Sequence, residues 1–139
     1  MACVPLTDKA ANNTSLVLEI TWRGRRLLFA GDAEQESWAL MAARARLKPV
    51  DLYKVAHHGS VTGHPPPPVL DLILPAARRQ EAVAVLSTRQ TPAYGEVPHP
   101  TVIGDLVQRT RWLYRTDASG EEERVAPGAP VVVSLPARE

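Results

Sequence analysis

The chain has 139 residues, enough for one domain with a single hydrophobic core. Its 16 Lys and Arg residues against 15 Asp and Glu residues leave a net charge of +1, which gives no reason to expect nucleic-acid binding by bulk electrostatics. Cys3 is the only cysteine, which excludes an internal disulfide and a thiolate zinc site. Any bound metal must therefore be held by His and carboxylate side chains.

No membrane segment is expected, because no apolar stretch is long enough to cross a bilayer. The first 15 residues contain no apolar core of the kind found in signal peptides. Both features favour a cytoplasmic protein. We treat residues 1–139 as one domain that begins with an irregular segment at residues 1–14.

The first half of the chain reads as two strands, a helix and a third strand. Branched and apolar residues predict a hairpin of two strands, followed by strong helix formers and then another apolar stretch. The expected elements are strands at 15–21 and 26–30 around a turn at 22–25, a helix at 33–47 ended by Pro49, and a strand at 51–56.

The second half continues this alternation and closes with strands. Four consecutive prolines lead into a short helix, and an almost wholly apolar segment predicts a strand covered on both faces. The expected elements are a helix at 69–74, a strand at 81–87, a loop at 88–100, a helix at 101–109, a strand at 111–115, a turn at 116–120 and a last strand at 131–135. The fold class is therefore α/β (α+β), with a mixed, mostly antiparallel sheet and helices on one face.

Asp32 is the first candidate site residue. It follows Gly31 at the end of an apolar strand, where a side chain is held at the rim of the sheet. It also precedes a helix, and Gln35 stands three residues later in the spacing of a capping box. Helix capping is the favoured interpretation of this motif alone, and it is compatible with metal binding.

His57 and His58 form the second candidate, directly after another strand. Imidazole is the commonest nitrogen ligand of zinc and also suits proton transfer near neutral pH. The alternative is a polar loop without a function. A strand–helix–strand unit separates Asp32 from His58, and such a unit returns the chain to the same end of the sheet. We therefore expect Asp32 and His58 to lie side by side.

These residues do not complete a catalytic zinc site, which needs about three protein ligands. His64 and His99 could be recruited as further ligands, although exposed loop histidines are the favoured interpretation of both. Ser60 is a weaker candidate for a nucleophile, because it lacks the Gly-x-Ser-x-Gly motif of a nucleophile elbow.

Three segments together resemble the metallo-β-lactamase superfamily: residues 12–18, residues 27–32 and residues 55–60. The nearest branch is similar to the hydrolase-like domain of the competence protein ComEC. Later segments at 84–87, 94–100 and 114–117, with Gly120, occur in the order found in that branch, so the resemblance runs from about residue 12 to residue 135.

The resemblance implies an αββα sandwich that binds two divalent metal ions, zinc or manganese. It places a bridging ligand at Asp32 and a second-ion ligand at His57 or His58; we prefer His58 as the ligand and His57 as the catalytic residue that contacts substrate or donates protons. The implied reaction is hydrolysis by metal-bound hydroxide, on phosphodiester or related ester bonds in a small molecule or a nucleic acid.

The chain departs from this family because no histidine precedes position 57, so the upstream His-x-His-x-Asp-His motif is absent. Only the C-terminal half of the sandwich is represented. We expect partial or weak metal binding, little turnover, and either a missing N-terminal half or self-association over the uncovered sheet. The alternative function is that of a non-catalytic remnant or fragment, which acts as a scaffold or binding module.

Overall fold

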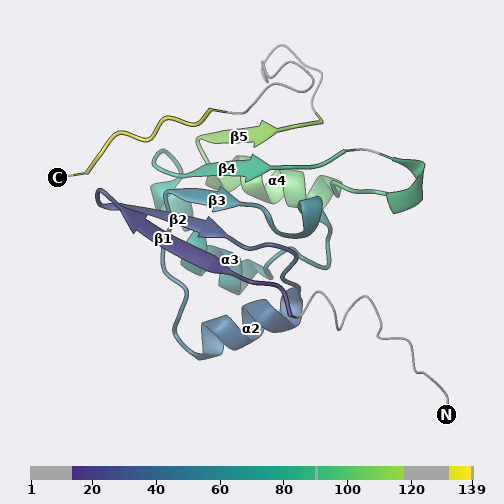
Figure 1. Cartoon of the computed structure of the whole chain (residues 1–139), viewed down its shortest axis with the longest axis horizontal. Helices are drawn as coiled ribbons and strands as arrows, with labels where there is room; N and C mark the ends of the chain where they lie inside the picture. Colours follow the sequence, from purple (N-terminus) through teal and green to yellow (C-terminus); the bar gives the residue numbers. More distant parts are fainter. Residues whose placement is uncertain (1–13, 90, 118–131, 139) are drawn as a thin grey trace.

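Figure 1 shows the computed structural model, in which residues 14–89, 91–117 and 132–138 are described. The expected N-terminal segment therefore lies outside the described residues, except for Thr14. The five strands are β1 (Leu18–Trp22), β2 (Arg25–Phe29), β3 (Leu52–Lys54), β4 (Val83–Leu86) and β5 (Trp112–Arg115). The helices are α2 (Gln35–Ala43), α3 (Pro67–Ile73) and α4 (Pro100–Arg109), with short 3₁₀ turns at Ala56–Gly59, Ala76–Arg78 and Pro92–Tyr94.

The strands form one mixed sheet in the order β1-β2-β3-β4-β5. Only β1 and β2 pair antiparallel, whereas β2–β3, β3–β4 and β4–β5 are all parallel. The expectation of a mostly antiparallel sheet is therefore wrong. The physical reason is that a helical crossover separates each strand from the next after β2, and such a crossover brings the chain back to its starting edge. The coarser expectation of a mixed α/β fold is confirmed.

The helices lie on one side of the sheet, as Figure 1 shows. The side chains that face the helices are buried. Among them are Leu28, Tyr53 and Ala84, which are paired across β2, β3 and β4 and are 3%, 0% and 0% exposed. Trp38 of α2 is also 0% exposed, and its ring meets that of Tyr53 edge-on at 6.1 Å. Its indole N–H donates to the Gly63 carbonyl at 2.8 Å, so the helix is tied to the loop after β3.

Helix α2 is shorter than expected at both ends. It begins at Gln35 rather than residue 33, and Glu34 stands at its N-cap without a side-chain capping bond. It ends before Ala45, whose positive φ of 50° breaks the helical path. Pro49 is therefore not what ends the helix. Across the described ranges, none of the helices has the length and apolar character needed to cross a membrane.

The expected last strand is also wrong for the part that can be seen. Residues 132–138 join no strand of the sheet, and Val131 lies outside the described ranges. The segment is instead anchored at its end, where the Arg138 N–H donates to the Arg23 carbonyl at 3.1 Å and the Arg25 guanidinium donates to the Pro136 carbonyl.

Asp51, just before β3, is the ionic centre of this anchoring. Its carboxylate is 2% exposed and lies 3.2 Å from Arg25, 3.1 Å from Arg78 and 2.9 Å from Arg138. It also accepts the backbone N–H of Arg26 at 2.8 Å. A buried carboxylate is tolerated when its oxygens are paired and hydrogen-bonded, as they are here.

The face of the sheet turned away from the helices carries exposed apolar side chains. Ile20, Trp22 and Trp112 are 47%, 59% and 54% exposed. Ile20 and Trp112 lie on the two edge strands, and Leu52 and Val83, which are paired between them, are 8% and 6% exposed. Large exposed apolar patches mark association surfaces in soluble proteins.

Self-association through this face is the first expected outcome. The wild-type chain should elute in size-exclusion chromatography as a concentration-dependent oligomer, and Ile20→Lys should shift it toward the monomer because a charge is placed in the apolar face. The matched control is Leu72→Lys, which changes an exposed leucine of α3 (42% exposed) and should elute like the wild type. A wild-type monomer at every concentration would contradict the expectation.

Candidate metal centre

The candidate residues follow three adjacent parallel strands. Asp32 comes after β2, His57 and His58 come after β3, and Ser87 directly follows β4. The carboxyl ends of parallel strands meet at one edge of a sheet, which is where α/β folds place their ligands. The loop after β2 is tied to the loop after β3 by the His57 N–H, which donates to the Gly31 carbonyl at 2.9 Å.

His58 is held as a metal-binding histidine would be. Its Nδ1 lies 2.8 Å from the Ser87 carbonyl oxygen, which can only accept, so Nδ1 carries the proton. The lone pair is then on Nε2, which lies 3.9 Å from Oδ1 of Asp32. A backbone carbonyl that fixes one ring nitrogen is the usual outer support of a metal-ligating imidazole.

Asp32 is positioned by its backbone and leaves its carboxylate available. Its N–H donates to Oγ of Ser15 at 2.8 Å, and its side chain is 50% exposed. A Cβ at Gly31, where φ is +54°, would come within 2.6 Å of the same Ser15 oxygen, so glycine is required for this close approach. The expectation that Asp32 caps α2 is wrong, because the N-cap position belongs to Glu34.

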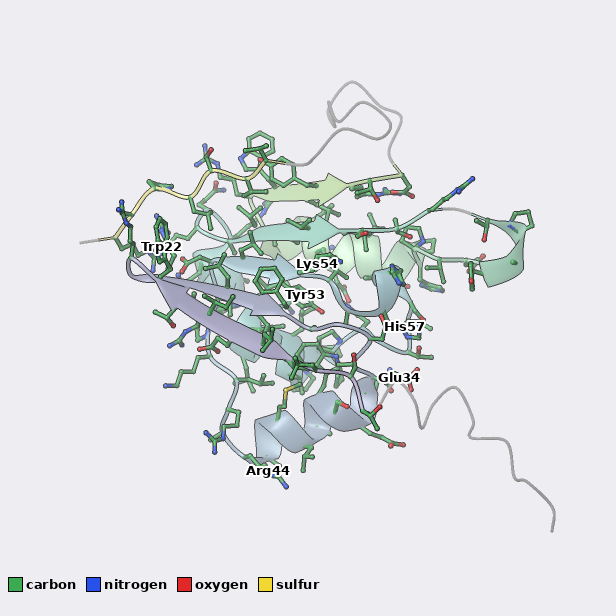
Figure 2. The ribbon with its side chains drawn as sticks, viewed as in Figure 1. Trp22, Glu34, Arg44, Tyr53, Lys54 and His57 are labelled. Atoms are coloured by element: carbon green, nitrogen blue, oxygen red, sulfur yellow. The ribbon has the colours of Figure 1, made fainter. Side chains whose placement is uncertain are left out.

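His57 faces a buried carboxylate that sequence reasoning did not single out. Its Nδ1 lies 3.6 Å from Oε1 of Glu34 and 3.4 Å from the Thr62 hydroxyl, which is itself 3.4 Å from Glu34. Figure 2 shows Glu34 and His57 near each other beside the start of α2. On its other side, His57 leaves so little room that a Cβ at Gly63 would meet it at 2.5 Å. The signal available in the sequence was an acidic residue two positions after Asp32.

Both histidines have left-handed backbone angles, with φ of 44° at His57 and 53° at His58. Such angles are unfavourable for residues other than glycine and collect at functional sites. The turn begins at Ala56, whose N–H donates to the Tyr53 hydroxyl oxygen at 3.2 Å. Tyr53 is fully buried, and this burial raises its pKa far above the ordinary value, while the bond from Ala56 lowers it slightly.

Tyr53→Phe is expected to lower the free energy of unfolding by about 1–3 kcal/mol at pH 7, because the Ala56 N–H loses its acceptor in a buried position. In the wild type, the unfolded tyrosine ionises above about pH 10 while the folded one stays neutral, so stability falls as the pH rises past that point. Urea unfolding at pH 7 and pH 10.5 should show a smaller alkaline loss in the variant. Tyr94→Phe, at a residue 73% exposed, should keep the wild-type alkaline loss.

His64 and His99 lie away from the Asp32–His58 pair. His64 is 8% exposed, contrary to the expectation of an exposed loop histidine, and its Nε2 lies 2.9 Å from Asp105 of α4. His99 stands at the N-cap of α4, where its Nδ1 accepts the Thr101 N–H at 3.2 Å. Both histidines are thus used to hold helix α4.

A cleft of about 680 Å³ opens beside the candidate residues. It is lined by Asp32, His57, His58, Ser60, Thr88, Arg89, Thr91, Tyr94 and Val97. Lys54, at the end of β3, has its pKa lowered by burial, and the negative charge of Asp32 partly offsets this shift. The Ser60 hydroxyl bonds to Thr62 at 3.0 Å, so it is not paired with a base in the manner of a nucleophile.

The chain gave no significant match to a protein-family profile, a curated protein or a solved structure. Within the described ranges, no group of three or more His, Cys, Asp or Glu side chains could hold an ion. The Asp32–His58 pair nevertheless fits a divalent ion, since it offers one carboxylate and one imidazole nitrogen with its lone pair free. What the arrangement provides is two ligands, fewer than a catalytic zinc needs.

Proposed function

We propose that this chain is the C-terminal half of a metal-dependent hydrolase of the metallo-β-lactamase fold, acting on phosphodiester or related ester bonds. The observation that carries the proposal is the pairing of Asp32 with His58 at the carboxyl edge of the parallel strands, with the Ser87 carbonyl fixing the imidazole. The sheet with helices on one face is compatible with half of an αββα sandwich.

Asp32 and His58 are the residues that would hold the metal, zinc or manganese. A divalent ion held there supplies Lewis acidity, which polarises an ester and lowers the pKa of water. The residues of the chain do the rest: Ser87 orients His58, and Ser15 fixes the backbone of Asp32. In the proposed complete site, Asp32 would be among the residues that hold the two ions.

His57 is the proposed proton carrier. Glu34 and Thr62 both face its Nδ1, which leaves Nε2 as the nitrogen for the cleft that His57 lines. A carboxylate behind an imidazole fixes the ring and its tautomer, and contacts of this kind tighten when substrate binds. Glu34 is therefore a positioning residue for His57.

On this proposal, the metal site formed by the chain alone is incomplete. Two protein ligands leave the ion weakly held, and the apolar face around Ile20, Trp22 and Trp112 is what an absent second layer would cover. The isolated chain should therefore bind zinc or manganese weakly and turn over little substrate.

The test measures bound zinc and manganese by elemental analysis and then hydrolysis of bis-nitrophenyl phosphate. Substoichiometric metal with only slight turnover is the expected result, and robust hydrolysis by the chain alone would contradict it. His57→Ala should keep the metal content while losing the residual turnover, whereas His58→Ala should lose both. If His57→Ala lost the metal and His58→Ala kept it, the roles of the two histidines would be exchanged.

A scaffold or binding module is the second candidate function, favoured by the exposed apolar face of the sheet. A scaffold would associate through this face with no need of Asp32 or His58. Association that persists in the Asp32→Ala, His58→Ala double variant, together with zero metal binding by the wild type, would favour this function over the hydrolase.

A further inference from the structure

We propose that Thr88, Arg89 and Thr91 form a phosphate-binding subsite in the cleft beside the metal centre, so that the substrate is held through a phosphate group as well as by the metal. The subsite rests on the proposed function for its biological meaning, but its binding of phosphate can be measured without metal. The three residues follow β4, and all of them line the cleft.

Two hydroxyl groups provide the first observation. The Oγ1 atoms of Thr88 and Thr91 are buried and have no hydrogen-bond partner within the described ranges, and Thr88 as a whole is only 8% exposed. A buried hydroxyl without a partner costs about 1–3 kcal/mol, and such groups are rare in native proteins. Both side chains line the cleft, so rotation about one side-chain bond would let each hydroxyl donate to a ligand oxygen and gain the partner that it lacks.

Arg89 provides the second observation, from charge. It is exposed and forms neither a hydrogen bond nor an ion pair with any residue that the structure describes, whereas Arg25 and Arg78 are paired with Asp51. Among the described residues that line the cleft, Asp32 is the only one with a carboxylate. A guanidinium group offers several donors in a planar fork that matches phosphate oxygens, and it stays charged at every physiological pH.

The backbone holds the subsite close to the metal centre. The Thr88 N–H donates to the Thr116 hydroxyl at 2.8 Å, and that hydroxyl donates to the Thr88 carbonyl at 2.7 Å, so Thr88 is fixed to the end of β5. Ser87, which orients His58, is the residue before it. Since consecutive Cα atoms are about 3.8 Å apart, the Cα of Arg89 lies within about 7.6 Å of that of Ser87.

The experiment titrates inorganic phosphate into the chelator-treated, metal-free chain and measures binding by calorimetry at low salt. The wild type should show saturable binding, and Arg89→Gln should weaken it at least about tenfold, because a charge-assisted bond is lost. Thr88→Val should weaken it several-fold without lowering the melting temperature, because the valine removes a buried hydroxyl that has no partner.

Arg44→Gln is the matched control. Arg44 is likewise exposed, and Figure 2 shows it at the far end of α2, well away from His57. The Arg44→Gln variant should bind phosphate as the wild type does. If the Arg44 and Arg89 variants lost affinity for phosphate equally, the effect would come from net charge alone and the subsite would be wrong. A wild type that does not bind phosphate would also overturn the subsite.

The outcomes separate the subsite from the proposed hydrolase. His58→Ala should lose metal and keep phosphate binding. If the wild type binds phosphate through Arg89 but never binds metal, the subsite stands and the hydrolase proposal fails. If metal binds and hydrolysis occurs while Arg89→Gln binds phosphate like the wild type, the hydrolase stands and the subsite is wrong.

Discussion

Asp32→Asn is expected to remove the proposed binding of zinc and manganese, with a loss of affinity greater than about 100-fold. Losing an outer support of a metal ligand already costs about 10–100-fold, and Asp32 is one of the two proposed ligands at this edge of the sheet. The amide keeps the shape of the carboxylate but lacks its charge, so the fold should be retained. Calorimetric titration of each ion into the metal-free protein measures the effect, with the melting temperature as the check on folding.

The matched control is Asp105→Asn, which also breaks an aspartate–histidine contact. Asp105 lies 2.9 Å from His64, outside the cleft lining. This variant should bind metal as the wild type does while melting at a lower temperature, because His64 is buried. Wild-type metal affinity in Asp32→Asn would show that Asp32 is not a ligand and would count against the proposed hydrolase.

Asp51→Asn is expected to lower the free energy of unfolding by about 3–5 kcal/mol, the usual cost of breaking a buried ion pair from one side. The three guanidinium groups around Asp51 would lose their shared buried partner, while the Arg26 N–H would keep an acceptor. Urea unfolding at pH 7 measures the difference.

Glu81→Gln provides the comparison within the same ionic cluster. Its carboxylate bonds to Arg78 and Arg138, and Arg78 above all holds the pKa of Glu81 below its usual value. Glu81 is exposed, so solvent screens its charge and the loss of stability should be far smaller than in Asp51→Asn. Similar losses in the two variants would show that burial is not what makes Asp51 important.

Much of the local structure could be predicted because its signals are local. The hairpin of β1 and β2, the crossover helices and the strand before His57 all follow from apolar periodicity and from turn residues such as Gly24. The meeting of Asp32 and His58 followed from one topological rule, that a strand–helix–strand unit returns to the same edge. No comparable rule tells which of two adjacent histidines turns a ring nitrogen toward Asp32.

What the sequence missed depends on contacts between distant residues. Glu34 reaches His57 across 23 positions, and Asp51 gathers arginines from both ends of the chain. The direction of the sheet is hidden in the sequence because a hairpin at the start and a strand-like stretch at 131–135 favour antiparallel pairing, whereas the three crossover helices make the remaining pairs parallel. Residues 132–135 have the composition of a strand but form none, because β-propensity reflects packing and pairing as much as the residue itself.

The left-handed angles at His57 and His58 have a consequence for how this loop balances folding against chemistry. Each non-glycine residue in that region costs about 1–3 kcal/mol, and here two are consecutive. A chain selected for stability alone would carry glycine at both positions. The two histidines thus make the loop after β3 less stable than glycines would. They also place two imidazoles side by side at the cleft.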